Sequence, residues 1–399
     1  MTGYKKNQLI QVTVTDLSHD GEGIGKSDAF TWFIKDAVPG DVVEASVMKE
    51  KKTYGYARLQ RVITPSPDRC KPKCVIARAC GGCTLQAMSY EAQLKYKKNK
   101  VKNNLERIGG FDFSDKESQV EFADTIGMDD PWRYRNKAQY PIGTDRNGKV
   151  VSGFYAAHSH DIINCDDCLI GIEENKAIIE CIKKQYHPSM RHVLIRKGFK
   201  TGQLMVCVVA GRKIRFTLPP ELGVTTTVLN INDKDTNVIL GDETIVLDGP
   251  GYIEDYIGDL KFRISAQSFF QVNPVQVEQL YGKAEEFASL TGNEIVWDLY
   301  CGIGTITLSL AQHAKKVYGV EVVEPAIRDA EQNAEINGIE NTLFFAGDMK
   351  DILNKSFIEQ YGKPDVIITD PPRAGMHEDV VNTILFAAPK RIVYVSCNP

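Results

Sequence analysis

The stretch Asp298-Leu299-Tyr300-Cys301-Gly302-Ile303-Gly304 decides the fold of the C-terminal part of this chain. The apolar segment 294–299 before it predicts a strand, and the pattern of 305–313 after it predicts a helix. Glycines at such a turn let the backbone approach a ligand at the carboxyl end of the strand, where open α/β sheets bind. As a dinucleotide fingerprint the stretch is a poor match, because Thr307 stands where the third glycine would be.

Strands and helices alternate on both sides of this turn. We expect strands at 316–320, 342–346, 365–369 and 391–396, and helices at 275–290 and 325–337. Alternation at this spacing predicts a parallel sheet with helices on both faces, an α/β Rossmann-like domain.

Acidic residues follow successive strands of this predicted sheet. Glu321 lies about 20 residues after the glycine turn, where a carboxylate can accept both ribose hydroxyls of an adenosine. Asp348 follows the third strand, where an acid can meet the adenine amine, although alone it is equally well a helix N-cap. With Asp298 at the first strand, this order resembles the class I S-adenosyl-L-methionine-dependent methyltransferase fold.

Two short motifs follow the fourth and fifth strands. Asp370-Pro371-Pro372-Arg373 is similar to the Asp/Asn-Pro-Pro-aromatic motif of amino-methyltransferases, but Arg373 stands at the aromatic position and counts against that chemistry. Ser396-Cys397-Asn398-Pro399 places a cysteine at the next strand end, where the alternative is a buried structural thiol. A thiolate that adds to C6 of uracil turns C5 into a nucleophile, which is covalent catalysis that divides one difficult step.

These motifs together resemble the RNA (uracil-5-)-methyltransferase family, in its iron–sulfur, TRAM-domain branch that acts on 23S rRNA. The resemblance is carried by Phe269–Pro274, Asp298–Gly304, Gly319–Glu321, Asp370–Arg373 and Ser396–Pro399. It implies transfer of a methyl group from S-adenosyl-L-methionine to C5 of a uridine in RNA, with 23S rRNA as the expected substrate, through a bond between Cys397 and C6.

The resemblance also implies a role for each matched residue. Phe269 could stack on the base or be a core aromatic, and Asp370 could hydrogen-bond the uracil as well as the cofactor. The implied cofactor contacts are Gln271, Tyr300, Glu321 and Asp370; the strand-end pattern adds Asp348 as a candidate. The family's general base, a glutamate, is expected beyond Pro399, so the methyltransferase domain is expected to be incomplete at its C-terminus.

The N-terminal part predicts a small β domain. Segments 8–15, 31–35, 41–49 and 56–62 have strand character, and glycine-rich turn chemistry occurs at 21–25 and 39–41. Several short strands in so few residues suggest an OB-like barrel, a common nucleic-acid scaffold. The family resemblance makes it a TRAM domain for RNA.

The charge is distributed unevenly along the chain. Residues 1–110 hold 19 Lys and Arg against 11 Asp and Glu, whereas the remainder holds 29 against 41. This favours a basic arm for a polyanion as much as it favours an ordinary uneven surface. Segment 90–107 predicts a lysine-rich helix, whose lysines are either a solvated face or a surface for RNA.

The boundaries of three domains follow from these patterns. We expect the barrel at 1–63, a mixed α+β central domain at 64–264 and the methyltransferase domain at 265–399. Hairpin signals occur in the central domain at 145–148 and 248–251.

Cysteines gather in two places. Cys74, Cys80 and Cys83 are followed much later by Cys168, and four cysteine ligands suit either zinc or a 4Fe–4S cluster. The family resemblance favours a 4Fe–4S cluster on these four residues. Cys165 is an alternative to Cys168 as the fourth ligand.

The composition excludes several classes of protein. No apolar run reaches the roughly 18 residues of a membrane helix, and the N-terminus has no signal-peptide pattern. We therefore expect a cytoplasmic protein without a membrane partner. We also expect a monomer whose macromolecular partner is RNA. The rival from another class is a non-catalytic RNA-binding protein with a vestigial enzyme body.

Overall fold

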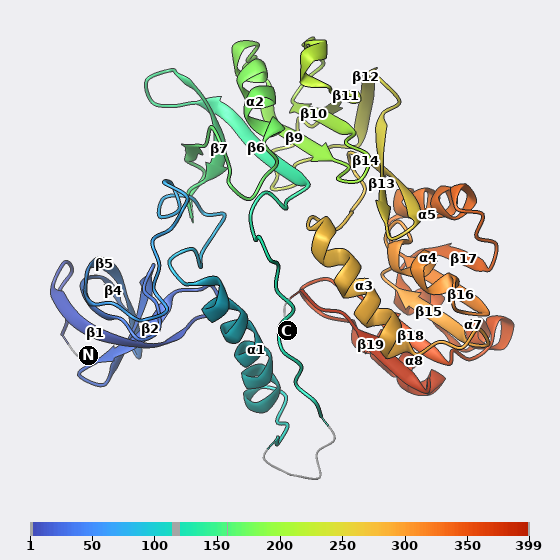
Figure 1. The fold of residues 1–399 in the computed structure, drawn as a ribbon, viewed down its shortest axis with the longest axis horizontal. Helices are drawn as coiled ribbons and strands as arrows, with labels where there is room; N and C mark the ends of the chain where they lie inside the picture. Colours follow the sequence, from blue (N-terminus) through green and yellow to red (C-terminus); the bar gives the residue numbers. More distant parts are fainter. Residues whose placement is uncertain (1–2, 114–119, 158, 398–399) are drawn as a thin grey trace. The chain divides into compact units, whose positions relative to one another are not determined.

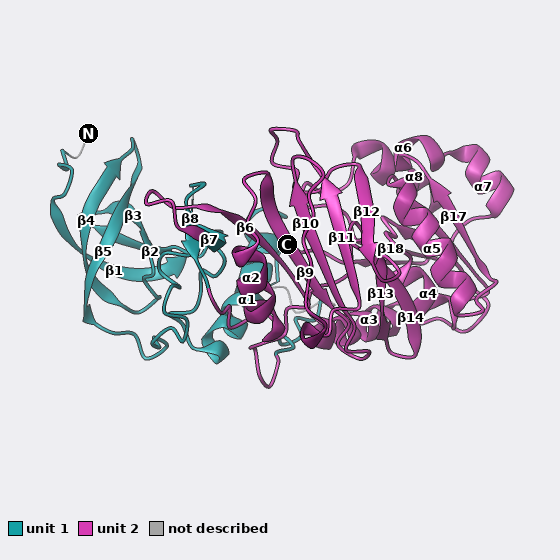
Figure 2. Cartoon of the chain, turned by 90° about the horizontal axis from the view of Figure 1, so that it is seen from above, with its two compact units in different colours: residues 1–127, 151–165 teal, residues 128–150, 166–399 magenta. Residues whose placement is uncertain are grey.

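The computed structural model describes residues 3–113, 120–157 and 159–397. The chain divides into two compact units (Figure 2). Unit 1 is formed by residues 1–127 and 151–165, and unit 2 by residues 128–150 and 166–399. The predicted domain boundaries at 63/64 and 264/265 stay predictions.

Unit 1 begins with a closed five-stranded barrel in the order β1-β2-β3-β5-β4. Its strands are β1 (Leu9–Leu17), β2 (Gly23–Ser27), β3 (Phe30–Lys35), β4 (Val42–Glu50) and β5 (Tyr54–Thr64). Alternate side chains, such as Val12, Trp32 and Val43, fill the barrel and are fully buried. The predicted OB-like barrel is confirmed.

One prediction in the barrel is wrong. The glycine-rich segment 21–25 is only partly a turn, because Gly23 begins strand β2. A Cβ on Gly25 would lie 2.3 Å from the carbonyl oxygen of Thr13, and one on Gly23 would lie 2.8 Å from that of Ala37. These glycines are therefore needed where backbone segments pack closely in the barrel. In the sequence, such glycines look the same as the glycines of a turn.

The rest of unit 1 contains one long helix and a hairpin. Helix α1 (Tyr90–Arg107) has the predicted bounds and begins where the Ser89 hydroxyl accepts a hydrogen bond from Ala92 N–H. Strands β7 (Val150–Tyr155) and β8 (Ile162–Asn164) pair antiparallel.

A buried ion pair fixes the start of the cysteine-rich segment 70–83 to the barrel. The Arg69 guanidinium lies 2.6 Å from Asp41 Oδ2, and Asp41 also accepts hydrogen bonds from the N–H groups of Val38 and Ser66. The Asp41 side chain is completely buried.

Unit 2 opens with a mixed sheet whose strands run in the order β12-β11-β10-β9-β6. The elements of this part are β6 (Lys137–Thr144), α2 (Glu174–Lys184), β9 (Met190–Lys197), β10 (Leu204–Ala210), η1 (Pro220–Leu222), β11 (Thr226–Ile231) and β12 (Glu243–Asp248). A separate hairpin joins β13 (Tyr252–Ile257) to β14 (Leu260–Ser265). The hairpin predicted at 248–251 is wrong, since β12 pairs with β11 and β13 with β14.

The C-terminal sheet of unit 2 is entirely parallel, in the order β17-β16-β15-β18-β19 (Figure 1). Its strands are β15 (Ile295–Leu299), β16 (Lys316–Glu321), β17 (Thr342–Ala346), β18 (Val366–Thr369) and β19 (Arg391–Tyr394). The helices are α3 (Pro274–Ala288), α4 (Thr305–Ala311), α5 (Glu324–Ile336), α6 (Met349–Ile352), α7 (Lys355–Tyr361) and α8 (Glu378–Ala387). The predicted Rossmann-like α/β class is confirmed.

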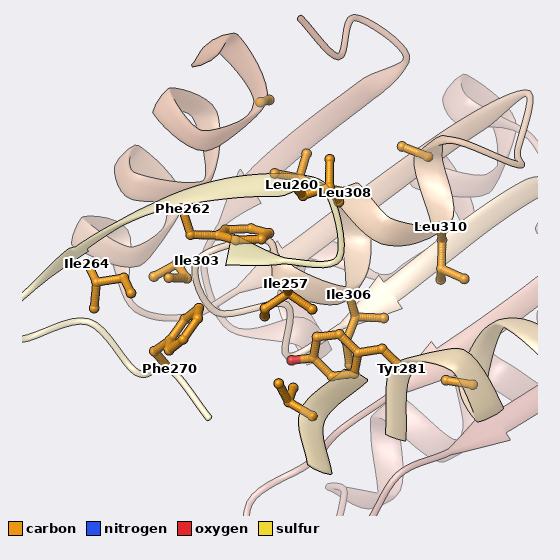
Figure 3. Close-up of a cluster of buried hydrophobic side chains, with 14 of the residues drawn as sticks. Ile257, Leu260, Phe262, Ile264, Phe270, Tyr281, Ile303, Ile306, Leu308 and Leu310 are labelled. Carbon is orange, nitrogen blue, oxygen red and sulfur yellow. The ribbon is translucent and has the colours of Figure 1, made fainter. Parts of the chain in front are cut away.

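Both faces of this sheet are covered, because its strands alternate between two apolar clusters. Val296 of β15 packs with side chains of α3, α4 and the β13–β14 hairpin, the cluster drawn in Figure 3. Its neighbour Trp297 packs on the opposite face with side chains of α6, α7 and α8. Two buried faces explain why these strands read as continuous apolar runs.

None of the helices among the described residues is long and apolar enough to cross a membrane.

Candidate active site

The glycine turn leaves its backbone open at the end of β15. Tyr300, Gly302 and Gly304 have left-handed φ values of 67°, 54° and 81°. Gly304 caps α4, and its Cβ position is crowded by Ala330 and Phe344. By contrast, nothing lies within 4 Å of the Cβ position of Gly302. The open side of Gly302 is therefore where a ligand can approach the main chain.

Glu321 faces this turn from the end of β16. Its Oε2 accepts a hydrogen bond from Gly302 N–H at 3.2 Å, and its Oε1 accepts one from Val323 N–H at 3.0 Å. Both contacts hold the half-buried carboxylate in one orientation and leave lone pairs for further donors. These residues fit the adenosine end of S-adenosyl-L-methionine.

The buried Asp298 and the half-buried Asp370 place two carboxyl groups next to this turn. Burial raises the pKa of Asp298 to about 7; the hydrogen bond from Thr307 Oγ1 lowers it in part, while the charges of Asp370 and Glu321 raise it further. Asp298 Oδ1 has no hydrogen-bond partner among the described residues. Burial also raises the pKa of Asp370, which follows β18.

Asp348 lies at the predicted strand end but is exposed. It is the N-cap of α6, accepts a hydrogen bond from Lys350 N–H at 3.2 Å, and lies 3.3 Å from Lys350 Nζ. These contacts lower its pKa. The N-cap alternative is confirmed, and a contact with adenine stays a prediction.

Gln271 reaches the glycine turn through one intermediate side chain. The Tyr281 hydroxyl lies 2.7 Å from Thr305 Oγ1 in the first turn of α4. Burial raises the pKa of Tyr281, and hydrogen bonds with Thr305 and the Gln271 side chain oppose that rise. The Gln271 carbonyl is itself held by Asn136 Nδ2 at 3.0 Å.

Phe269 is anchored by its neighbour and points its ring into solvent. Ser268 Oγ donates to Asp329 Oδ2 at 2.8 Å, and the Ser268 carbonyl accepts from Arg196 Nη2 at 2.8 Å. Phe269 is 66% exposed, so the core-aromatic alternative is wrong. An exposed ring on a fixed backbone is available for stacking on a base.

Cys397 follows β19, and Asp370 follows the neighbouring strand. Thr369 and Tyr394 are paired in the sheet, and Val395 N–H donates to the Thr369 carbonyl at 2.9 Å. Asp370 and Cys397 therefore leave the sheet at the same edge as Glu321. Cys397 is exposed, and its role as nucleophile stays a prediction.

One residue that shapes this site was not predicted from the sequence. Asn333 is fully buried in α5, donates to the Ile303 carbonyl at 3.2 Å and accepts from Arg263 N–H at 2.8 Å. It holds the glycine turn against β14. Its polar side chain on the inward face of a predicted helix was the available signal.

The four cysteines predicted to bind a cluster are divided between the units. Cys74, Cys80 and Cys83 belong to unit 1, as does the alternative Cys165, and Cys168 belongs to unit 2. Within the described ranges, no group of three or more His, Cys, Asp or Glu residues is arranged to hold a metal ion. A metal site on these four cysteines stays a prediction.

An aromatic cluster lies on the outer face of the barrel. The rings of Phe33, Tyr54 and Tyr56 contact one another with centroid separations of 5.5 to 5.7 Å, and all three are partly exposed. Such rings on a barrel can stack on unpaired bases.

Comparison with known proteins places this chain in a family. The model of the tRNA (Uracil-5-)-methyltransferase family matches residues 89–399, and that of the TRAM domain matches residues 5–59.

The curated relatives match almost the whole chain. An uncharacterized RNA methyltransferase of Halalkalibacterium halodurans is 47% identical over 99% of this chain and 89% of its own length. A second, from Clostridium acetobutylicum, is 45% identical with the same coverage.

A solved structure shares the fold. The crystal structure of the Pyrococcus abyssi tRNA (uracil-54, C5)-methyltransferase in complex with S-adenosyl-L-homocysteine matches with a TM-score of 0.75 and 25% identity. The match covers 98% of this chain and 91% of that one. The chain thus belongs to the tRNA (uracil-5-)-methyltransferase family and carries a TRAM domain at its N-terminal end.

Proposed function

We propose that this protein transfers the methyl group of S-adenosyl-L-methionine to C5 of a uridine in RNA, with Cys397 as the nucleophile. One observation carries the proposal: Glu321 ends a strand, and Gly302, Asp370 and Cys397 follow strands, that all end at one edge of the parallel sheet. Family membership and the S-adenosyl-L-homocysteine-bound neighbour support the same cofactor.

The chain's own residues divide the cofactor between them. Glu321 accepts the ribose hydroxyls, while Tyr300 and Gly302 form the wall of the adenosine site. Gln271 and Asp370 contact the rest of the cofactor. Asp348 is assigned to the adenine amine. When bound, the cofactor supplies an electrophilic methyl group.

Cys397 makes uracil reactive. Its thiolate forms a bond to C6, and the electron pair of the C5–C6 double bond moves onto the C4 carbonyl oxygen as an enolate. Asp370 holds the uracil ring, and Phe269 stacks on it. C5 takes up the methyl group, a base removes the C5 proton, and the C6–S bond breaks to return the thiolate.

Arg373 distinguishes this chemistry from transfer to an amine. A Pro-Pro-aromatic sequence stacks the amine-bearing base in the rival class, but residue 373 is an exposed arginine. The amino-methyltransferase alternative therefore lacks its stacking residue.

We propose 23S rRNA as the substrate, on the resemblance to the iron–sulfur, TRAM-domain branch. Transfer RNA is the second candidate, because the family description and the solved neighbour name tRNA. Nucleoside mass mapping of rRNA and tRNA from a strain lacking the gene distinguishes them. Loss of 5-methyluridine from 23S rRNA alone supports the proposal, and loss from tRNA alone replaces it.

A 4Fe–4S cluster on Cys74, Cys80, Cys83 and Cys168 is a further proposal, which rests on the spacing of the cysteines and the family resemblance. No step of the reaction is assigned to it. The predictions of a cytoplasmic and monomeric protein, and of three domains at 1–63, 64–264 and 265–399, are kept as proposals.

Transfer of a labelled methyl group tests the activity itself. The protein is incubated with labelled S-adenosyl-L-methionine and RNA from the deletion strain, beside Cys397→Ala. We expect label in 5-methyluridine with the wild type alone. RNA binding without transfer, with cofactor bound, would establish the non-catalytic alternative.

A further inference from the structure

Helix α1 is fixed to the barrel at one end of a polar groove. Ala92 packs with Leu17, Val38 and Met88 in a small apolar cluster. The Tyr96 hydroxyl donates to the Ser18 carbonyl at 3.0 Å. The first turns of the helix are therefore held in place, so that its remaining turns present a defined face to the barrel.

The groove between this face and β1 is a cavity of about 440 Å³ within unit 1. The helix lines it with Lys95, Asn99, Lys100, Asn103 and Arg107. Positions three or four residues apart share one side of a helix, and such spacings link these side chains into a continuous row. The row rises about 18 Å along the helix axis from the first to the last residue.

The cations of this row lack the carboxylate partners that other cations on the same helix have. Lys98 lies 2.6 Å from Asp124 and Lys102 lies 3.8 Å from Glu106, and neither lysine lines the groove. In the part of the chain that the structure describes, Lys95, Lys100 and Arg107 have no carboxylate oxygen within 4.0 Å. Helix α1 therefore neutralises some cations locally and leaves three unneutralised in the groove.

The opposite wall is not purely basic. Asp16 and Asp68 line the groove, and Asp16 Oδ1 accepts a hydrogen bond from Leu17 N–H at 2.8 Å. Carboxylates oppose a phosphate in direct contact but accept hydrogen bonds from ribose hydroxyls. The cations can contact phosphates, the carboxylates can accept hydrogen bonds from 2′-hydroxyls, and the amides can bind either phosphates or hydroxyls. This combination suits a sugar–phosphate backbone that contains ribose.

We propose that this groove binds the backbone of the substrate RNA, with Lys95, Lys100 and Arg107 contacting phosphates. The inference rests on the proposed function, since it assigns part of the RNA to a surface outside the methyl-transfer site. On this proposal the groove side of the lysine-rich helix is a surface for RNA and not only a solvated face.

Two matched triple variants test the groove. Lys95→Ala/Lys100→Ala/Arg107→Ala removes the groove cations, and Lys97→Ala/Lys98→Ala/Lys102→Ala removes the same charge from the same helix outside the groove. Alanine favours helix, and circular dichroism checks that both variants are folded. Binding of a short fluorescent single-stranded RNA of mixed sequence is measured by anisotropy over a range of salt, with the DNA of the same sequence as competitor.

We expect the groove variant to bind RNA more weakly. The slope of log K against log salt should become shallower by about 2, since each lost phosphate contact contributes about 0.7 on a single strand. The control variant should change the slope much less, and the groove variant should lose the wild type's preference for RNA over DNA. Equal weakening by both variants overturns the proposal, because general charge would then account for it.

Failure of this proposal is distinguishable from failure of the proposed function. If the groove variant binds and methylates RNA as well as the control does, the groove is wrong and methyl transfer stands. If the wild type transfers no methyl group to any RNA while RNA binding depends on the groove, the function is wrong and the groove stands as an RNA site.

Discussion

Glu321 Oε2 accepts a hydrogen bond of 3.2 Å from the backbone N–H of Gly302, which joins the end of β16 to the glycine turn that follows β15. The carboxylate is therefore oriented towards the turn by the fold itself. A ligand with two hydroxyl donors can therefore bind to both oxygens of a carboxylate that is already oriented. Binding then does not have to order the Glu321 side chain.

Removal of this carboxylate should weaken cofactor binding. In Glu321→Ala the ribose hydroxyls lose a charged acceptor, which contributes about 1.5–3 kcal/mol, so affinity for S-adenosyl-L-methionine should fall roughly 10- to 150-fold. Isothermal calorimetry measures it. Glu324→Ala, at an exposed residue paired with Arg328, is the control and should bind normally. Normal binding by Glu321→Ala would remove Glu321 from the site.

The Asp41–Arg69 pair should make the stability of the barrel depend on pH. Burial alone would raise the pKa of Asp41, but hydrogen bonds from Arg69, Ser66 N–H and Val38 N–H hold it below its usual value. Because the folded-state pKa lies below that of the unfolded chain, the carboxylate's contribution is fully present above a pH of about 4 and is lost as the pH falls through the lowered pKa.

Urea unfolding of Asp41→Asn at several pH values checks this. At neutral pH the variant should lose about 3 kcal/mol, as expected when one partner of a buried pair is removed, and the difference from wild type should shrink at acid pH. Glu44→Gln removes the exposed pair with Arg61 and should have little effect. A difference for Asp41→Asn that is constant with pH contradicts the assignment.

Phe269 should matter for RNA and not for folding. Its ring is largely exposed, so Phe269→Ala removes little packing, yet the loss of stacking costs about 1–3 kcal/mol. We expect kcat/KM for RNA to fall roughly 5- to 150-fold with cofactor affinity unchanged, and Phe269→Tyr to restore it. Val275→Ala, at another exposed residue nearby, serves as control. Full activity of Phe269→Ala would show that the ring does not touch the base.

Iron analysis tests the cysteine proposal independently of activity. Protein purified without oxygen should contain about four irons per chain, and Cys80→Ser should lose them. Cys181→Ser, outside both cysteine groups, should retain the metal. Stoichiometric zinc without iron would establish the other four-cysteine site that the spacing allows.

The sequence predicted best the helices and strands that have a regular pattern of apolar residues. Helix α1 has the predicted bounds, and the strand ends carrying Glu321 and Asp370 follow from the alternation of strands and helices. Strand β2 was missed because glycine in a crowded barrel cannot be told from glycine in a turn.

Contacts between distant segments lay beyond the sequence. The Tyr281–Thr305 and Ser268–Asp329 hydrogen bonds join residues 24 and 61 positions apart, and no local pattern marks such pairs. The exposure of Phe269 and of Cys397 likewise depends on tertiary packing. The structure thereby removed the alternative of a core aromatic for Phe269.

Covalent trapping tests the central claim, that Cys397 attacks the uracil ring, most directly. RNA with 5-fluorouridine at the target site is incubated with the protein and S-adenosyl-L-methionine, then resolved under denaturing conditions. Since fluorine cannot leave C5 as a proton does, the C6–S bond should persist, giving a shifted protein–RNA band whose RNA carries the methyl group. Cys397→Ala should give no such band, whereas Cys181→Ala should give it in full. Normal methylation of uridine RNA by folded Cys397→Ala would contradict the covalent mechanism and return the amino-methyltransferase alternative.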